Sequence, residues 1–298
     1  SSAASDVYKR QIPNRLYGIM TNSTLVAVPL FIFMGVILEK SKVAELLLNS
    51  MSKLFSKYKS GLGISILFVG TLLAASTGIV GATVIAMGLI SLPAMLQRGY
   101  SEKISTGLIA ATGTLGQIIP PSIALVILGD VLATAYQQSQ LKIGNYVAKS
   151  LSVGDLFMAA IVPGFILVII YGLYFIFTLR KENIISIGDS KDESFVKLIS
   201  TLAPPFFLIF SVLGSIIFGI ASPTEAAGIG ALGATLIAFF YRKLNLKILS
   251  ETTKQSAFIS SMVFLILIGA SIFSLVFRGL GGEAVSYTHL RAHETSTY

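Results

Sequence analysis

Long apolar runs separated by short polar segments make up most of the chain. About 20 residues, rising about 1.5 Å each, are needed to cross the hydrocarbon layer of a membrane, which is about 30 Å thick. The runs that approach or reach this length are residues 17–38, 104–131, 156–179, 198–220, 226–241 and 257–277. The pattern predicts an all-α polytopic membrane protein embedded in a lipid bilayer.

Residues 40–59 have a different pattern. Five lysines are interspersed there with apolar residues at helical spacing, which is typical of an amphipathic helix in the membrane interface. Positively charged loops are retained on the cytoplasmic side, so the lysines place this helix on the inner face.

Residues 61–92 form a 32-residue apolar run whose middle, 74–83, is rich in small and hydroxyl side chains. One helix of that length would be too long for a span, and two arms of roughly 13 to 15 residues would be too short. The run therefore predicts a re-entrant hairpin that returns to the side it left.

Residues 111–129, ATGTLGQIIPPSIALVILG, place a double proline inside an apolar run. Pro120 and Pro121 have no N–H group, so carbonyls near Gly116 and Gln117 lose their helical donors. Unpaired carbonyls are costly in hydrocarbon, and such a break is tolerated where it lines a protein cavity or binds a ligand. Glycines and hydroxyls alone could serve close helix packing, but the double proline favours a binding site.

The hairpin tip and the broken helix share a chemistry of hydroxyls and freed backbone groups without formal charge. Hydroxyl and carbonyl oxygens suit a monovalent cation such as Na⁺, and helix N-termini suit a carboxylate. The candidate ion- and substrate-binding residues are Ser76, Thr77, Gly78, Gly113, Thr114, Gly116, Pro120, Pro121 and Ser122. Within this set, Ser76, Thr77, Thr114 and Ser122 are the candidate side-chain ligands of Na⁺.

Ser222-Pro223-Thr224-Glu225 has the pattern of a helix start. Ser222 is an expected N-cap, Pro223 suits the first helical position, and Glu225 completes a capping box. A carboxylate at a membrane boundary could also receive an ion or a proton, so Glu225 is a secondary candidate for binding.

The distribution of charge supports the predicted orientation. The net charge is +8, and the basic residues border the apolar runs, whereas the two predicted outer loops contain only Lys142 and Lys149. Basic residues spread in this way do not form the single positive face of a nucleic-acid-binding protein.

Catalytic chemistry finds little support in the sequence. The chain has no cysteine, and its two histidines, His289 and His293, lie in the polar C-terminal tail. Asp130 follows an apolar run, but the second membrane aspartate of an intramembrane aspartyl protease is missing. We therefore expect a protein that is not an enzyme and needs no cofactor beyond a coupling ion.

Four motifs together carry a resemblance to a known family. They are LVAVPLFIFMG at 25–35, LPAMLQRGY at 92–100, GTLG followed by PPS at 113–122, and SPTEAA at 222–227. Over about residues 16–285 the chain resembles the large membrane subunit of tripartite ATP-independent periplasmic (TRAP) transporters, the DctM-like family. One departure is the hairpin tip, which is often Ser-Gly-Ser-Ser in the family and contains Thr77-Gly78 here.

The resemblance implies a secondary transporter of the ion-transporter superfamily, with an elevator-type fold built from inverted repeats. It implies sodium-driven uptake of a small organic acid or related solute across a bacterial or archaeal cytoplasmic membrane. A small membrane subunit and a periplasmic solute-binding protein would be its partners. The alternative is a channel-like or scaffolding membrane subunit without ion-coupled transport.

The same resemblance suggests a division of the chain. Residues 15–131 would be the first repeat, 132–155 an outer-loop insertion, and 156–285 the connecting spans with the start of the second repeat. The polar, patternless ends at 1–14 and 286–298 are expected to be non-native or disordered. The second hairpin and second broken helix of the family do not occur in the sequence, so only the first repeat and the start of the second are expected.

Overall fold

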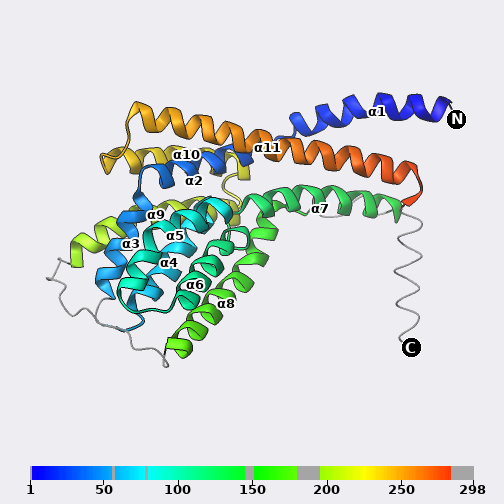
Figure 1. Cartoon of the computed structure of the whole chain (residues 1–298). Coiled ribbons are helices and arrows are strands. Elements are labelled where there is room, and N and C mark those ends of the chain that lie inside the picture. The colour runs from blue at the N-terminus through cyan, green and yellow to red at the C-terminus, as the bar shows by residue number, and fades with distance from the viewer. Residues whose placement is uncertain (1, 56–57, 78–79, 145–150, 180–194, 283–298) are drawn as a thin grey trace, which may run out of the picture. The chain divides into compact units, whose positions relative to one another are not determined.

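The computed structural model describes residues 2–55, 58–77, 80–144, 151–179 and 195–282. These residues form helices and turns and contain no strand, as expected for an all-α protein (Figure 1). In chain order the helices are α1 (Ser2–Met20), α2 (Ala27–Lys40), α3 (Val43–Leu54), α4 (Gly61–Thr77), α5 (Val80–Gln97), α6 (Glu102–Thr114), the 3₁₀ helix η1 (Leu115–Gln117), α7 (Ile123–Lys142), α8 (Val153–Leu179), α9 (Phe195–Ile217), α10 (Pro223–Phe240) and α11 (Leu246–Gly279).

The chain divides into two units. The larger one comprises residues 24–257, and the smaller one combines residues 1–23 with 258–298. Within the described residues, three helices are long and apolar enough to cross a membrane, namely α8, α10 and α11. These helices confirm the expectation of a multi-pass membrane protein.

The first predicted run, 17–38, is not one helix. Its start belongs to α1, residues 21–26 form turns, and α2 begins only at Ala27. The polar residues Asn22, Ser23 and Thr24 explain the interruption, because such side chains favour turns over helix interiors. Pro29 then lies in the first turn of α2, where its missing N–H costs nothing.

Two further helices extend beyond their predicted runs. α7 continues to Lys142, well into the segment 132–155 that was expected to be an outer loop. α11 starts at Leu246, eleven residues before the apolar run 257–277. Apolarity marks where hydrocarbon would lie, whereas these helices continue into polar sequence that retains good helix formers such as glutamine and lysine.

Helix α10 packs on α2 through small side chains. Gly230 lies against Met34 of α2 so closely that a Cβ atom would fall about 2.7 Å from the sulfur. The neighbouring small residues on the same face of α10 are buried, namely Ala226, Ala227, Ala231 and Ala234. Close backbone approach through small residues is a common way for membrane helices to associate.

The predicted amphipathic helix is present as α3. Val43, Leu47, Leu48 and Met51 form its buried face, and the helix packs against α4. Ser52 near its end accepts a hydrogen bond of 3.3 Å from the guanidinium of Arg98. This contact ties α3 to the segment that follows α5.

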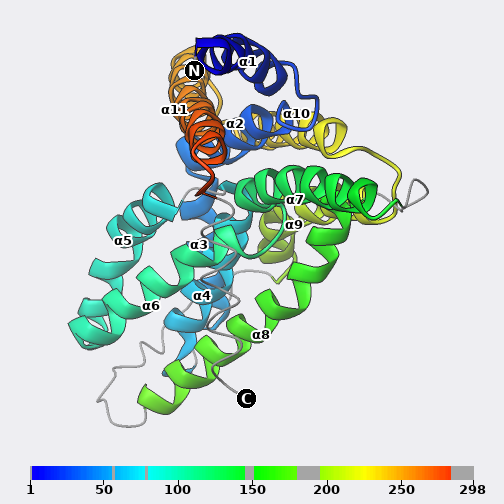
Figure 2. The same cartoon turned by 90° about the vertical axis from the view of Figure 1, so that its right-hand side faces the viewer.

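Helices α4 and α5 pack together as a hairpin (Figures 1 and 2). The hydroxyl of Tyr100, which follows α5, donates a hydrogen bond to the carbonyl of Lys59, which precedes α4. Burial raises the pKa of the Tyr100 hydroxyl above its usual range. The hairpin therefore returns to the end where it began.

The hairpin arms are longer than predicted. α4 has 17 residues and α5 has 18, which correspond to about 26 and 27 Å. The small residues after Leu73, including Ala74 and Ala75, continue α4 because alanine is a strong helix former. Arm length therefore does not distinguish a re-entrant hairpin from two full spans, and re-entry stays a prediction.

Candidate functional site

The double proline interrupts the helix as predicted. α6 ends at Thr114, the single turn η1 follows, and α7 starts at Ile123 with Ser122 as its N-cap. The peptide bond between Pro120 and Pro121 is cis. The break is therefore a compact turn that joins two helices within one apolar run.

Ser122 holds the two sides of the break together. Its hydroxyl donates a 2.9 Å hydrogen bond to the carbonyl of Gln117 and accepts one of 3.4 Å from the backbone N–H of Leu125. The side chain is fully buried. In a continuous helix the N–H of residue 121 would serve the Gln117 carbonyl, so the Ser122 hydroxyl replaces the donor that Pro121 lacks.

The Gly116 carbonyl, unlike that of Gln117, has no such replacement donor from Ser122. Its helical donor would be the N–H of residue 120, and Pro120 has none. Gly116 is buried, whereas the nearby side chain of Thr114 is exposed. The Thr114 hydroxyl donates to the Ala111 carbonyl at 2.7 Å, which leaves its oxygen lone pairs available as acceptors.

The break lies against the hairpin. η1 packs on both α4 and α5. A Cβ atom on Gly113 would collide with the side chain of Val84 in α5 and lie about 3.3 Å from its backbone nitrogen. A Cβ on Gly70 of α4 would likewise collide with the methyl group of Thr112. Gly113 therefore serves the close packing of α6 on α5, which is the role that a glycine here could have instead of ligand binding.

The hairpin tip is only partly described. Ser76 and Thr77 form the last residues of α4, but their side chains lie outside the described part of the structure, as does Gly78 altogether. The structure packs the helices of the hairpin, α4 and α5, against the break. Contacts between Ser76, Thr77 or Gly78 and the break stay a prediction.

Helix α8 covers the break from another direction. A Cβ atom on Gly164 would lie about 2.9 Å from the side chain of Ile119, so α8 and the break approach closely. Neighbouring Pro163 lies inside α8 without ending it. The break is thus surrounded by α4, α5 and α8.

Ser222 and Glu225 form the expected capping box at the start of α10. The backbone N–H and the hydroxyl of Ser222 donate to Oε2 of Glu225 at 2.7 and 2.8 Å, and the Glu225 N–H donates to the Ser222 hydroxyl at 3.3 Å. Ser152 and Asp155 make the same three contacts at the start of α8, at 2.9, 2.8 and 3.1 Å. The capping role of Glu225 is confirmed, and ion binding by Glu225 stays a prediction.

No group of three or more His, Cys, Asp or Glu side chains suited to a metal is found among the residues that the structure describes. A cation at the break would be held by hydroxyl and carbonyl oxygens. The sequence predicts these oxygens as ligands, but sequence reasoning missed the role of Ser122 as a bridge across the break. The signal was available in the order Pro-Pro-Ser, since serine is a preferred N-cap.

A hairpin packed on a broken helix, in a chain with several spanning helices, defines the class of multi-pass helical membrane proteins. Comparison with known families assigns the chain to one family within this class. The model of the family described as "Tripartite ATP-independent periplasmic transporter, DctM component" matches residues 4–291. The chain belongs to this family, which is a family of transporter subunits and not of enzymes.

Several individual proteins are similar to the chain. The C4-dicarboxylate TRAP transporter large permease protein DctM of Rhodobacter capsulatus is 33% identical over 253 residues, covering 85% of the chain and 57% of that protein. The ectoine TRAP transporter large permease protein TeaC of Halomonas elongata is 30% identical, with 85% and 56% covered. The isethionate TRAP transporter permease protein DctMQ of Oleidesulfovibrio alaskensis is 29% identical, with 84% and 37% covered. The chain spans about half the length of the first two relatives.

Proposed function

We propose that the chain is part of the large permease subunit of a sodium-coupled TRAP transporter in a bacterial or archaeal cytoplasmic membrane. The observation that carries this proposal is the break between α6 and α7. Pro120 leaves the Gly116 carbonyl without its helical donor, the side chain of Thr114 two residues earlier is exposed, and the break packs against the hairpin. Interrupted helices at membrane depth are typical of ion sites in secondary transporters.

The expected cation ligands are neutral oxygens. Gly116 would supply a backbone carbonyl, and Thr114, Ser122, Ser76 and Thr77 would supply hydroxyls. Ser122 already bonds to Gln117 and Leu125, so it would contribute one remaining lone pair while it keeps the break in shape. We propose that the break and the hairpin tip together form one half of a two-fold binding site. A two-fold site of this kind belongs to an elevator-type fold built from inverted repeats.

Family membership also supports the proposed partners and solute. The family is named for a tripartite periplasmic system, and the names of the similar proteins specify C4-dicarboxylates, ectoine and isethionate. We propose that a small organic acid or related solute is delivered by a periplasmic solute-binding protein. A small membrane subunit would complete the complex, and the name DctMQ of the isethionate permease supports such a partner.

Reconstitution in liposomes tests the proposal. The complete permease that contains this chain is reconstituted with its small subunit, and uptake of radiolabelled succinate, ectoine and isethionate is measured with the cognate binding protein outside. We expect uptake of one solute only with an inward Na⁺ gradient and only with the binding protein present. Ion flux without binding protein would support the channel-like alternative, and the absence of any flux would support the scaffolding alternative.

A further inference from the structure

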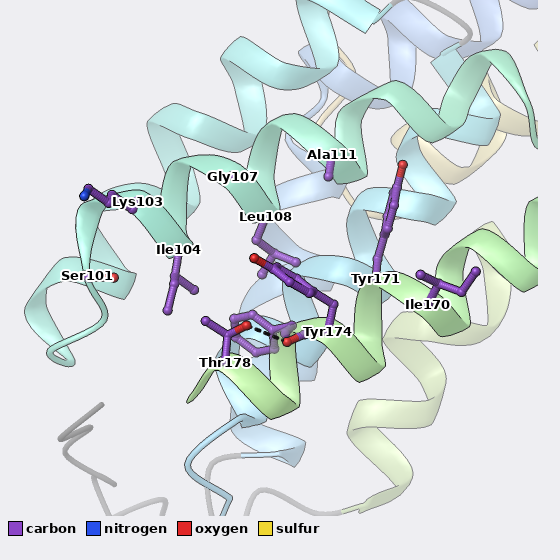
Figure 3. A pocket seen from close by; sticks show the side chains of 11 residues that line it. Ser101, Lys103, Ile104, Gly107, Leu108, Ala111, Ile170, Tyr171, Tyr174 and Thr178 are labelled. Atoms are coloured by element: carbon purple, nitrogen blue, oxygen red, sulfur yellow. Dashed lines mark hydrogen bonds between the residues drawn. The ribbon is translucent and has the colours of Figure 1, made fainter. Parts of the chain in front are cut away.

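A groove of about 750 Å³ runs between α6 and α8, away from the helix break (Figure 3). Leu108 of α6 and Phe175 of α8 are almost completely buried and form its floor. Ile170 and Tyr174 on α8 are half or more exposed and leave the groove open along one side. Gly107 contributes no side chain, and nothing lies within 4 Å of the position that its Cβ would take.

The open side of the groove continues into a surface suited to hydrocarbon. α8 is one of the helices that can span a membrane, and Phe165, Ile166 and Ile169 on it are more than half exposed. The groove follows α6 from Ser101 to Ala111, a rise of about 15 Å. A flexible apolar chain of that length fits these walls better than a compact solute, which would need more polar partners.

One end of the groove is polar. Ser101, which precedes α6, and Lys103 in its first turn lie there, together with Thr178 of α8 (Figure 3). The Thr178 hydroxyl donates to the Tyr174 carbonyl at 2.8 Å. Lys103 is exposed. This is the end at which the hairpin begins and returns, so it lies among the basic segments that the charge distribution places on the cytoplasmic side.

The described charges near this end are positive on balance. The segments at this end contain three basic residues, Lys59, Arg98 and Lys103, and one carboxylate, the exposed Glu102. Arg98 is bonded to the Ser52 hydroxyl. Anionic lipids are attracted to basic side chains at the cytoplasmic surface of a membrane. The charge, the apolar walls and the open side therefore match one class of molecule, with a negative head group and an apolar tail.

We propose that the α6–α8 groove binds one anionic phospholipid of the cytoplasmic leaflet. One acyl chain lies along Leu108 and Phe175, and the phosphate lies beside Lys103. Such a lipid contacts α6, which leads into the break, and α8, which packs against the break, and it fixes the spacing between these two helices. The proposal requires only the membrane setting and does not rest on sodium coupling or on solute uptake.

Lipid retention by the complete purified permease tests the groove directly. Phosphatidylglycerol and phosphatidylcholine with the same acyl chains are added to delipidated protein, and bound lipid is counted by native mass spectrometry. We expect one tightly retained phosphatidylglycerol, with a preference of about fivefold over phosphatidylcholine from one basic contact. Equal retention of the two lipids, or no retained lipid, would overturn the proposal.

Two variants locate the lipid. Gly107→Leu fills the groove and should remove the tightly bound phosphatidylglycerol. Gly88→Leu is the matched control, since Gly88 on α5 also has nothing within 4 Å of its Cβ position but does not line the groove. Lys103→Gln should keep the lipid and abolish the head-group preference. Unchanged retention in Gly107→Leu, or an unchanged preference in Lys103→Gln, would contradict the assignment.

If Gly107→Leu does not fold, cross-linking experiments that leave Gly107 unchanged test the proposal instead. Phosphatidylglycerol with a photoreactive acyl chain should label peptides from residues 104–111 and 170–175. A photoreactive phenylalanine at Ala111 provides the reverse experiment and should capture lipid. Capture of another segment of the full-length permease at Ala111 would show that protein fills the groove and would overturn the proposal.

Discussion

Ser122 shows how one side chain can stabilise an interruption that the prolines create. Its hydroxyl is both an acceptor for the first turn of α7 and a donor to the Gln117 carbonyl. Ser122→Ala should therefore lower the free energy of unfolding by about 1–2 kcal/mol, through the loss of the cap and of a buried partner. Thermal unfolding of the detergent-solubilised permease, followed by circular dichroism, measures the change. A stability equal to that of the wild type would show that the contact is energetically neutral.

Thr114 allows the proposed cation site to be probed with little structural disturbance. Its side chain is exposed, so Thr114→Val keeps the shape and removes an oxygen. We expect the Na⁺ concentration for half-maximal uptake to rise about fivefold, equivalent to about 1 kcal/mol for one oxygen contact. Thr106→Val is the control, because Thr106 is also exposed on α6 and also donates to a carbonyl of the preceding turn, at 2.7 Å. Equal Na⁺ dependence in both variants would remove Thr114 from the site.

At the scale of elements, the approach of α6 to α5 depends on a glycine. A methyl group at Gly113 would collide with Val84, whereas one at Gly107 on the same helix meets nothing. Gly113→Ala should destabilise the permease by about 1–3 kcal/mol through overpacking. Gly107→Ala should be neutral or stabilising by up to about 1 kcal/mol, because alanine is favoured over glycine in helices.

The double variant Gly113→Ala with Val84→Ala tests the cause of that destabilisation. Removing the side chain that the new methyl group meets should restore much of the lost stability, as expected for residues in direct contact. If the two changes were simply additive in thermal unfolding, the contact between Gly113 and Val84 would not explain the effect.

The double proline is the element-scale feature on which the proposed function depends. Pro120→Ala with Pro121→Ala restores two N–H donors, for the carbonyls of Gly116 and Gln117, so α6 and α7 can join into one helix. We expect loss of Na⁺-dependent uptake with normal membrane insertion, measured in liposomes and by quantifying permease in membranes. Unchanged sodium dependence in this variant would refute the break as the ion site.

The elements differ in how far sequence could predict them. The break and the capping box of Glu225 were predictable because proline chemistry and N-cap preferences are local. The collision between Gly113 and Val84 was not, because it depends on the register of two helices that only tertiary packing sets. Span ends were also predicted imperfectly, as the extension of α7 to Lys142 shows, since hydropathy measures transfer into lipid and not the end of a helix.

At the scale of the whole molecule, the basic segments between the apolar runs predict an orientation in the membrane. Ser101 and Lys103 precede the break, and α7 leads from it to the polar segment around Ser139, so the two regions should lie on opposite sides of the membrane. The chain has no cysteine, and single cysteines can therefore report each position separately.

Labelling of single-cysteine variants with a membrane-impermeant maleimide in intact cells tests this orientation. Ser139→Cys should be labelled from outside, because this part of α7 is exposed. Glu102→Cys, also exposed, should be labelled only after the membrane is permeabilised. Labelling of both positions from the same side would mean that the break turns the chain back instead of carrying it across. A single crossing of α6 and α7 would then be excluded, and the break would be the tip of a second re-entrant hairpin instead of an interruption within one span.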